Sequence, residues 1–248
     1  MKILLIDTCG ATGSLALADT AHSPVFIDCA RLPGRSAAER LVPTIRSLAT
    51  GSRISLHELD AVTVVHGPGS FTGVRVGLSA AKGLCHALNL PLIAISRLAV
   101  LAQMGVPHSS HRDGWGMNIH ALLDAGRGEF YSGIYSDGVC LREELVTREQ
   151  LLALLDLAAQ GREPLPVPVV CEPAVAQSLA ALTPQLVAEP SAPDALPLAF
   201  ARIQQRAFDD AATIDANYLR RSDAEIFAKP IAAAVLQPHR TRSATTAQ

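Results

Sequence analysis

The chain has 248 residues, of which 49% are hydrophobic and only 4% aromatic, and its formal net charge at pH 7 is −2. This charge excludes the general attraction to phosphate that basic nucleic-acid-binding proteins show. The five cysteines are scattered and form no C-x-x-C pair, which argues against a zinc site and against a disulfide framework. A core built from Ala, Leu, Val and Ile favours helices packed on a sheet, so we expect an α/β protein.

The first predicted element is a buried strand at residues 3–6, followed by a turn at 7–13 and an antiparallel return strand at 14–18. The apolar run meets Asp7 too early for a signal-peptide core, and no later stretch supplies ~18 uninterrupted apolar residues. We therefore expect a cytoplasmic protein without a membrane segment.

Capping-box spacing marks the start of the next two elements. Ser36 and Glu39 precede a predicted helix at residues 37–49, which Pro43 should kink or split. The same spacing recurs shortly before the β-branched run at 61–65, which is typical of a buried parallel strand.

A glycine-rich loop follows that strand and leads into a predicted helix at residues 72–88; a strand at 91–95 and a helix at 98–104 come next. Backbone N–H groups at such a helix start can receive an anion. The loop lacks the Lys-Ser or Lys-Thr of a Walker A loop, however, and misses the dinucleotide fingerprint by one residue. The loop could contact a partner protein or bind a nucleotide, and the sequence leaves both interpretations open. The arginine could instead form a surface salt bridge. The residues concerned are Gly67, Pro68, Gly69, Ser70, Phe71, Thr72 and Arg75.

Two lines of small residues run along the helix predicted at 72–88. Glycine inside a helix costs roughly 1 kcal/mol relative to alanine, so its presence calls for a close contact. One line would suffice for packing on the chain's own sheet, and the second suggests a helix from another chain. The lines consist of Gly73, Gly77 and Ala81 and, beside them, Val76, Ala80, Gly83 and Ala87.

The N-terminal pattern recurs in the second half of the chain. Residues 121–124 read as a strand, 125–128 as a turn and 130–135 as another strand, so that Asp7 and Asp124 take matching places. A repeat at so wide a spacing suggests the duplication of a domain.

The later elements complete two predicted lobes. We expect helices at 150–159, 174–182 and 198–208, a strand at 167–171 and a connector at 184–197. The first lobe is predicted to span residues 1–105 and to be completed by 198–228, the second spans 106–197 with the crossing in the polar stretch 106–116, and 229–248 form a disordered tail.

Four motifs carry a resemblance to a known family, in the same order and at similar spacing: the glycine run with its helix start, the opening Ile6-Asp7-Thr8, the turn at 124–131 and the late Tyr218-Leu219-Arg220. Together they resemble the TsaB (YeaZ) family over roughly residues 1–222. The resemblance implies a two-lobed, duplicated actin-like fold of the ribonuclease H-like (ASKHA) superfamily. It also implies a protein that is not an enzyme but an inactive relative of one.

The same resemblance implies a set of partners. The chain would pair with a TsaD-type catalytic subunit through the helices at 37–49 and 72–88. With a TsaE-type ATPase, the complex would transfer a threonylcarbamoyl group to N6 of adenosine 37 in tRNA. A homodimer could form when the partner is absent, tRNA would be contacted only through the complex, and ATP or ADP would bind only at the partner interface. The matching interface positions are Glu39, Leu41, Pro43, Gly73, Val76, Gly77, Ala80 and Ala81, and the second-lobe turn contributes Asp124, Arg127 and Glu129.

The chain departs from the family pattern at two places. Ala37 and Ala38 stand where the family often has His-Ser, so a polar contact of that helix is lost. Gly126 and Phe130 replace residues that are commonly Arg and Val in the second-lobe turn.

Patterns for independent catalysis are weak. The His-x-x-x-His pair of a metal-dependent transferase is missing, and His108 and His111 lie in a polar loop. Asp7 and Asp124 lack the further carboxylates of a two-metal nuclease, and Ser70 lacks the G-x-S-x-G elbow. We therefore expect no catalytic residue, no metal and no cofactor bound to the chain alone. The alternative is a self-sufficient nucleotide-dependent transferase or peptidase of the actin-like fold.

Overall fold

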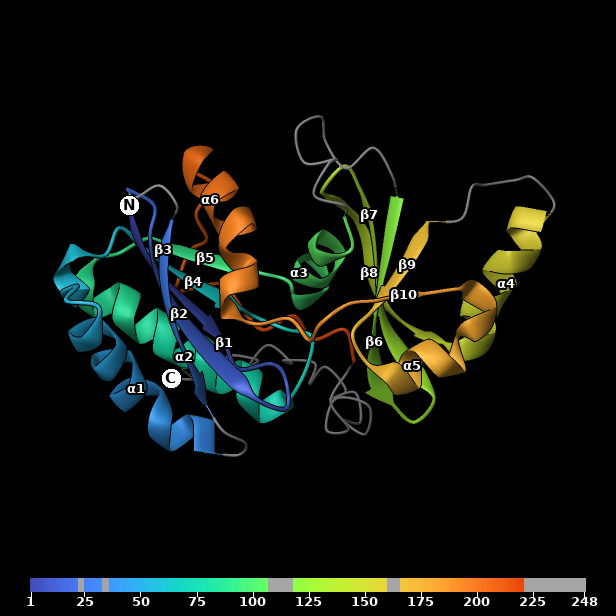
Figure 1. Ribbon diagram of the computed structural model, residues 1–248, viewed down its shortest axis with the longest axis horizontal. Coiled ribbons are helices and arrows are strands. Elements are labelled where there is room, and N and C mark those ends of the chain that lie inside the picture. The colour runs from blue at the N-terminus through green and yellow to red at the C-terminus, as the bar shows by residue number, and fades with distance from the viewer. Residues whose placement is uncertain (22–24, 33–35, 107–117, 160–165, 221–248) are drawn as a thin grey trace, which may run out of the picture.

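A computed structural model describes residues 1–21, 25–32, 36–106, 118–159 and 166–220. The predicted crossing at 106–116, except its first residue, lies outside these ranges, as do His108, His111 and the tail at 229–248. The described chain forms two lobes, each built on one five-stranded sheet (Figure 1).

The first sheet has the strand order β3-β2-β1-β4-β5. Strands β1 to β3 form an antiparallel meander, while β4 runs parallel to β1 and β5 parallel to β4. Every residue of β4 is buried, as expected for a central strand covered on both faces. The strands are β1 Lys2–Asp7, β2 Gly13–Asp19, β3 Phe26–Leu32, β4 Ala61–Val65 and β5 Leu92–Ile95.

The second sheet, with the order β10-β9-β6-β7-β8, repeats this connectivity. An antiparallel meander, β6 to β8, is again followed by two strands parallel to its first strand. The strands are β6 Asn118–Gly126, β7 Glu129–Ser136, β8 Val139–Thr147, β9 Val167–Val170 and β10 Gln185–Leu186. The predicted duplication and the two-lobed actin-like α/β fold are thus confirmed.

Helices cover both faces of each sheet (Figure 1). Helices α1 and α2 lie on one face of the first sheet, and α6 on the other, so the chain returns to the first lobe near its described end. Helices α4 and α5 lie on the outer side of the second sheet. The helices are α1 Ala37–Gly51, α2 Phe71–Leu88, α3 Arg97–Met104, α4 Arg148–Ala159, α5 Pro173–Ser178 and α6 Leu196–Gln204, with short 3-10 turns at Leu56–Glu58, Ala180–Leu182 and Ala192–Ala195.

Several local predictions need correction. Helix α1 continues through Pro43, so the predicted split is wrong; the proline lies on the exposed side, where the carbonyl it leaves without a partner can be hydrated. The Ser36 side chain makes no capping hydrogen bond. By contrast, the second predicted capping box forms, between Ser55 and Glu58, although it starts a 3-10 turn rather than a helix.

Helix α3, predicted as part of the first lobe, packs on both lobes. Its buried Val100 belongs to the first lobe's core, whereas the helix also lies against β6 and β7 of the second sheet. Its buried Leu98, Leu101 and Ala102 join the second lobe's core with Ile119 and Tyr135. Helix α3 therefore links the two lobes mechanically.

A buried histidine in the second lobe makes stability depend on pH. His120 Nε2 lies 2.7 Å from Ser132 Oγ, and both side chains are buried. Burial, and to a smaller extent the charge of Arg142, lowers the pKa of His120 to about 4 from its ordinary 6.5. The unfolded chain therefore binds this proton first as the pH falls.

We expect the free energy of unfolding to drop by about 2 kcal/mol between pH 7.5 and pH 5 because of His120. The contribution is complete above pH 6.5 and is lost as the pH falls toward 4. Urea unfolding of the wild type and His120→Gln at both pH values measures it, with exposed His57→Gln as the matched control. An equal pH dependence in all three proteins would contradict the assignment.

Candidate functional site

The glycine-rich loop and the first turns of α2 pack against the turn that follows β1. A Cβ atom at Gly73 would overlap the carbonyl oxygen of Thr8, and one at Gly77 would overlap the Thr8 hydroxyl. A Cβ at Gly69 would likewise overlap the carbonyl oxygen of Cys9. These glycines are required because the helix lies directly on the backbone of its own lobe.

Hydrogen bonds hold this close approach in place. Thr8 Oγ1 donates to the Gly73 carbonyl at 2.6 Å, and the Ser70 N–H donates to the Cys9 carbonyl at 2.8 Å. Ser70 is the N-cap of α2, and its hydroxyl accepts from the Gly73 N–H at 3.3 Å. The hydroxyl of Ser70 therefore stabilises the start of α2.

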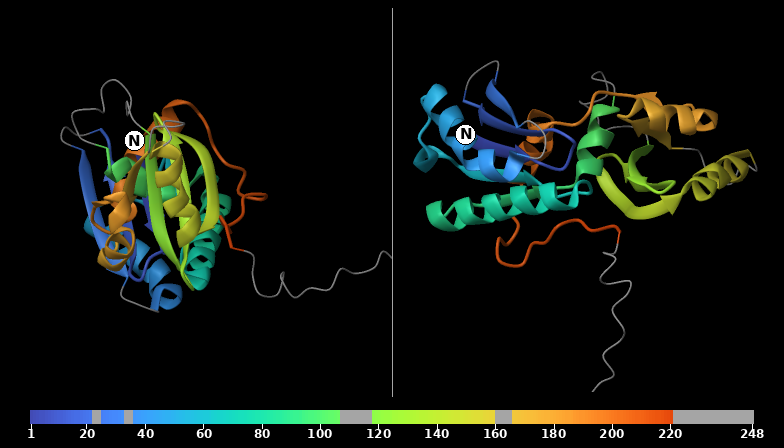
Figure 2. Two further views of the ribbon diagram at one scale, coloured as in Figure 1. Left: turned by 90° about the vertical axis from the view of Figure 1, so that its right-hand side faces the viewer. Right: turned by 90° about the horizontal axis from the view of Figure 1, so that it is seen from below.

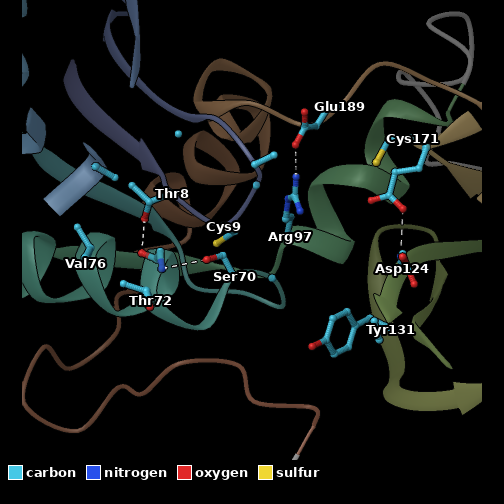
Figure 3. Close-up of a pocket in the computed structure, with 18 of the residues that line it drawn as sticks. Thr8, Cys9, Ser70, Thr72, Val76, Arg97, Asp124, Tyr131, Cys171 and Glu189 are labelled. Carbon is cyan, nitrogen blue, oxygen red and sulfur yellow. Dashed lines mark hydrogen bonds and ion pairs between the residues drawn. The ribbon is translucent and has the colours of Figure 1, made fainter. Parts of the chain in front are cut away.

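A cleft of about 920 Å³ separates the lobes. The first lobe lines it with the Thr8–Ala11 turn, Ser70 and Thr72, and the second lobe with Asp124, Tyr131 and Glu172 (Figure 3). Arg97 and Glu189 line it between these two sides (Figure 3). Because three carboxylates face one guanidinium, the second-lobe side of this cleft does not favour a phosphate group.

Arg97 is a buried basic residue at the junction of the lobes. It is the first residue of α3, its side chain is 7% exposed, and its Nη2 lies 2.9 Å from Glu189 Oε1. Asp7 is also buried; desolvation raises the pKa of its carboxyl, and the charge of Arg97 acts against that rise. Among the described residues, no partner accepts a hydrogen bond from the buried Nε of Arg97.

The two matching aspartates each accept a hydrogen bond within their own turn. Asp7 Oδ1 accepts from the Cys9 N–H at 2.8 Å, and Asp124 Oδ1 accepts from the Gly126 N–H at 2.7 Å. Each carboxylate therefore stabilises the turn that follows its strand. Within the described ranges, no group of three or more His, Cys, Asp or Glu side chains is placed to hold a metal ion.

Other candidate reactive groups are also engaged in structure. His66 Nδ1 lies 3.1 Å from the carbonyl oxygen of Asp215. The Cys9 thiol is buried and donates to the Val65 carbonyl at 3.1 Å, and burial raises the pKa of this thiol well above its usual range. It therefore stays protonated at neutral pH and is a poor nucleophile.

The predicted interface residues divide into two groups. Leu41, Gly77 and Ala81 are buried in the first lobe's own core, and Gly73 packs on Thr8, so their prediction as surface contacts is corrected. The line Gly73, Gly77 and Ala81 is the one that faces the sheet. The exposed or half-buried predicted positions are Glu39, Pro43, Val76 and Ala80.

The outward surface of α1 and α2 is small-residue-rich and partly apolar. On α2, Ser79, Gly83 and Ala87 are exposed, and a Cβ at Gly83 would meet no atom within 4 Å. On α1, Val42 is 49% exposed beside Pro43. This outward face stays a predicted contact surface.

A C-terminal strap, defined here as residues 215–220, ties the lobes together along α2 (Figure 2). On the first lobe, the Asn217 N–H donates to the His66 carbonyl at 2.8 Å. On the second lobe, Asn217 Nδ2 donates to Glu143 at 2.6 Å, and Arg220 donates to Glu129 at 2.5 Å. Glu129, predicted in the second-lobe turn, thus holds the strap.

The strap also positions an exposed cluster at the start of α2. The Nε of Arg75 donates to the Tyr218 hydroxyl at 2.7 Å, and the guanidinium carbon lies 3.7 Å from the centroid of the Phe71 ring. Arg127 lies nearby at a cavity wall, in the left-handed region with φ of 61°.

Sequence patterns missed the residues that join the lobes: Arg97, Glu189, Glu143 and Asn217. None belongs to a periodic or capping motif. Arg97 had one local signal, since it directly follows the helix N-cap Ser96 at the end of a buried strand. The others are identified only by their three-dimensional contacts.

Among the helices that the structure describes, none is long and apolar enough to cross a membrane.

Comparison with known proteins agrees with the geometry. A family model described as TsaD, tRNA N6-adenosine threonylcarbamoyltransferase, matches residues 31–233. The structure of YeaZ from Pseudomonas aeruginosa aligns with a TM-score of 0.63 at 26% identity, covering 88% of this chain and 99% of that chain.

Two curated relatives share the name tRNA threonylcarbamoyladenosine biosynthesis protein TsaB. The Bacillus subtilis protein is 33% identical over 152 residues, which cover 61% of this chain and 62% of that protein. The Escherichia coli protein is 34% identical over 135 residues, covering 54% and 55%. The chain thus matches little more than half of the length of these relatives. Because the family model spans most of the chain and the YeaZ structure aligns with both lobes, the chain belongs to the TsaD family and is a TsaB (YeaZ)-type protein.

Proposed function

We propose that this chain is a non-catalytic accessory subunit in the synthesis of threonylcarbamoyladenosine on tRNA. It would pair with a TsaD-type transferase, with a TsaE-type ATPase as the third component. The observation that carries the proposal is the outward face of α2, where Ser79, Gly83 and Ala87 are exposed and leave room for a second helix; Val42 of α1 is an exposed apolar residue as well.

The state of the polar groups supports a role without chemistry. Asp7, Asp124 and Ser70 each cap their own turn or helix, and Arg97 is paired with Glu189. Groups with such structural partners are poorly placed to activate a nucleophile or to transfer a proton. We infer that catalysis takes place in the partner and that ATP or ADP binds only where the two chains meet.

Close packing explains why small residues matter on this face. The axes of packed helices lie about 8–10 Å apart, and small side chains at the contact allow the shorter distances in that range. The same face of a second copy offers the same surface, so a homodimer is the expected state without the partner.

The test is a reconstituted threonylcarbamoyl transfer to unmodified tRNA with TsaD, TsaE, ATP and the threonylcarbamoyl donor. We expect product only when this chain is added to TsaD. Product from this chain alone would establish the alternative, a self-sufficient transferase, and hydrolysis of peptides by the chain alone would establish a peptidase. No effect of the chain in any mixture would contradict the accessory role.

Gly83→Leu tests the contact face directly. Because a Cβ at this position meets no atom within 4 Å, the variant should fold like the wild type. Its affinity for TsaD should fall by about tenfold or more, since a leucine blocks the helix approach. Gly83→Ala is the matched control and should pair normally. Unchanged pairing of folded Gly83→Leu would remove this face from the interface.

A further inference from the structure

An exposed aromatic–arginine cluster lies at the start of α2, beside the interlobe cleft. Phe71 is 48% exposed and Tyr218 is 41% exposed, and their ring centroids are 5.6 Å apart. Large aromatic side chains that stay this exposed side by side are typical of contact surfaces.

Arg75 lies on the Phe71 ring and bonds the Tyr218 hydroxyl. Its guanidinium carbon lies 3.7 Å from the Phe71 centroid and 5.6 Å from the Tyr218 centroid, and its Nε bonds the Tyr218 hydroxyl. Within the part of the chain that the structure describes, no carboxylate pairs with this guanidinium. Because Arg75 is exposed and its hydrogen bond to Tyr218 uses Nε, its terminal nitrogens can donate to a phosphate.

A cavity of about 330 Å³ adjoins the cluster and shares its chemistry. Phe71, Tyr131 and Tyr218 give it aromatic walls, and Arg127 and Arg220 give it positive charge. No carboxylate lies among its described lining residues, although Glu129 partly neutralises Arg220 from outside. The larger interlobe cleft, lined by three carboxylates, has the opposite character.

We propose that this aromatic–arginine pocket binds an unpaired nucleotide of an RNA. The base would enter the cavity and stack on Phe71 and Tyr218, which line it, and its phosphate would contact Arg75 of the adjoining cluster. This inference rests on the proposed function, in which the complex acts on tRNA. Flat rings beside guanidinium groups are the surface that single-stranded RNA recognises, whereas a paired base is not available for such stacking.

The net charge of −2 limits how strongly the isolated chain can bind RNA. A single local patch cannot provide the long-range attraction of a basic RNA-binding domain. The pocket therefore adds one or two contacts to RNA that the partner holds, and the isolated chain should bind RNA weakly and detectably only at low salt.

The experiment is ultraviolet crosslinking of the full chain to labelled unmodified tRNA at low salt, with identification of the crosslinked peptide. We expect the crosslink in peptides that contain Phe71 or Tyr218, and about tenfold less crosslink for Phe71→Ala. Phe208→Ala, which removes a 43% exposed ring elsewhere, is the matched control and should crosslink like the wild type. Equal yields for both variants, or a crosslink confined to other peptides, would overturn the proposal.

Two further experiments distinguish RNA from the other possible ligands of the pocket. Arg75→Ala should weaken binding and make it less salt-dependent, unlike exposed Arg46→Ala on α1. A fully paired RNA duplex should compete poorly, and competition by free AMP as strong as that by tRNA would show a mononucleotide site and overturn the RNA assignment. Loss of TsaD pairing in Phe71→Ala, with normal crosslinking, would show a protein contact and overturn it too.

The outcomes distinguish this inference from the proposed function. If modification of tRNA requires the chain but no crosslink forms at the pocket, only the RNA contact fails. If the pocket crosslinks to RNA but the chain does not stimulate modification, the accessory role fails and the RNA contact stands.

Discussion

Replacement of Arg97 by methionine is expected to lower the free energy of unfolding by about 3–5 kcal/mol, the largest effect that we expect from one side chain. Methionine keeps much of the apolar stem but removes the charge. Asp7, which is 2% exposed, then loses the nearby positive charge that opposes its desolvation, and Glu189 loses its partner at the junction of the lobes. Calorimetry should show a melting temperature lower by roughly 10 °C.

The pH dependence of Arg97→Met follows from Asp7. The pKa of this carboxyl is already raised by burial, and without Arg97 it should rise further. A carboxyl whose pKa is higher in the folded state than in the unfolded state binds its proton more readily when folded, so stability falls as pH rises between the two values. The stability that the variant loses relative to the wild type should therefore be smaller at pH 5 than at pH 7.5.

Glu189→Gln is the control for the exposed half of the ion pair. The Glu189 side chain is 49% exposed, so its loss should change stability by less than about 1 kcal/mol. Double replacement of Arg97 and Asp7, to Met and Asn, should recover stability relative to Arg97→Met alone. A melting temperature of Arg97→Met equal to that of the wild type would show that the buried charge is not structural.

The same glycine-to-alanine change is expected to have opposite effects at two positions of α2. Gly73→Ala should destabilise the chain by about 3 kcal/mol, because the new Cβ would overlap the carbonyl oxygen of Thr8 and force the helix off the β1 turn. That shift would also break the hydrogen bond from Thr8 Oγ1 to the Gly73 carbonyl.

Gly83→Ala should instead stabilise the chain by about 0.5–1 kcal/mol. Its Cβ meets no atom within 4 Å, so the gain in helix propensity is not opposed by any clash. Chemical denaturation of both variants gives the two signs in one experiment. Changes of the same sign at both sites would contradict the assignment of the inward and outward faces of α2.

Local patterns were enough to predict the repeated strand–turn–strand units, because each is complete within about 20 residues. Asp7 and Asp124 bind the backbone two residues ahead, which is a contact that the turn sequence itself specifies. Helix α2 was predicted within one residue of its start, since Ser70 caps it. Strands β3 and β8 were missed because edge strands are half exposed and show little hydrophobic pattern.

The sequence by itself determined a duplicated α/β fold, the loop-to-helix motif and the family resemblance, all of which depend on neighbouring residues. Only the tertiary structure decided which line of small residues on α2 faces the sheet, because both lines follow the three- or four-residue spacing of a helix face. It also decided where charges are buried: Arg97 pairs with Glu189 across 92 positions, and Arg75 bonds Tyr218 across 143. Such contacts depend on how the two lobes and the strap pack together, and this packing cannot be predicted from the local periodicity of the sequence.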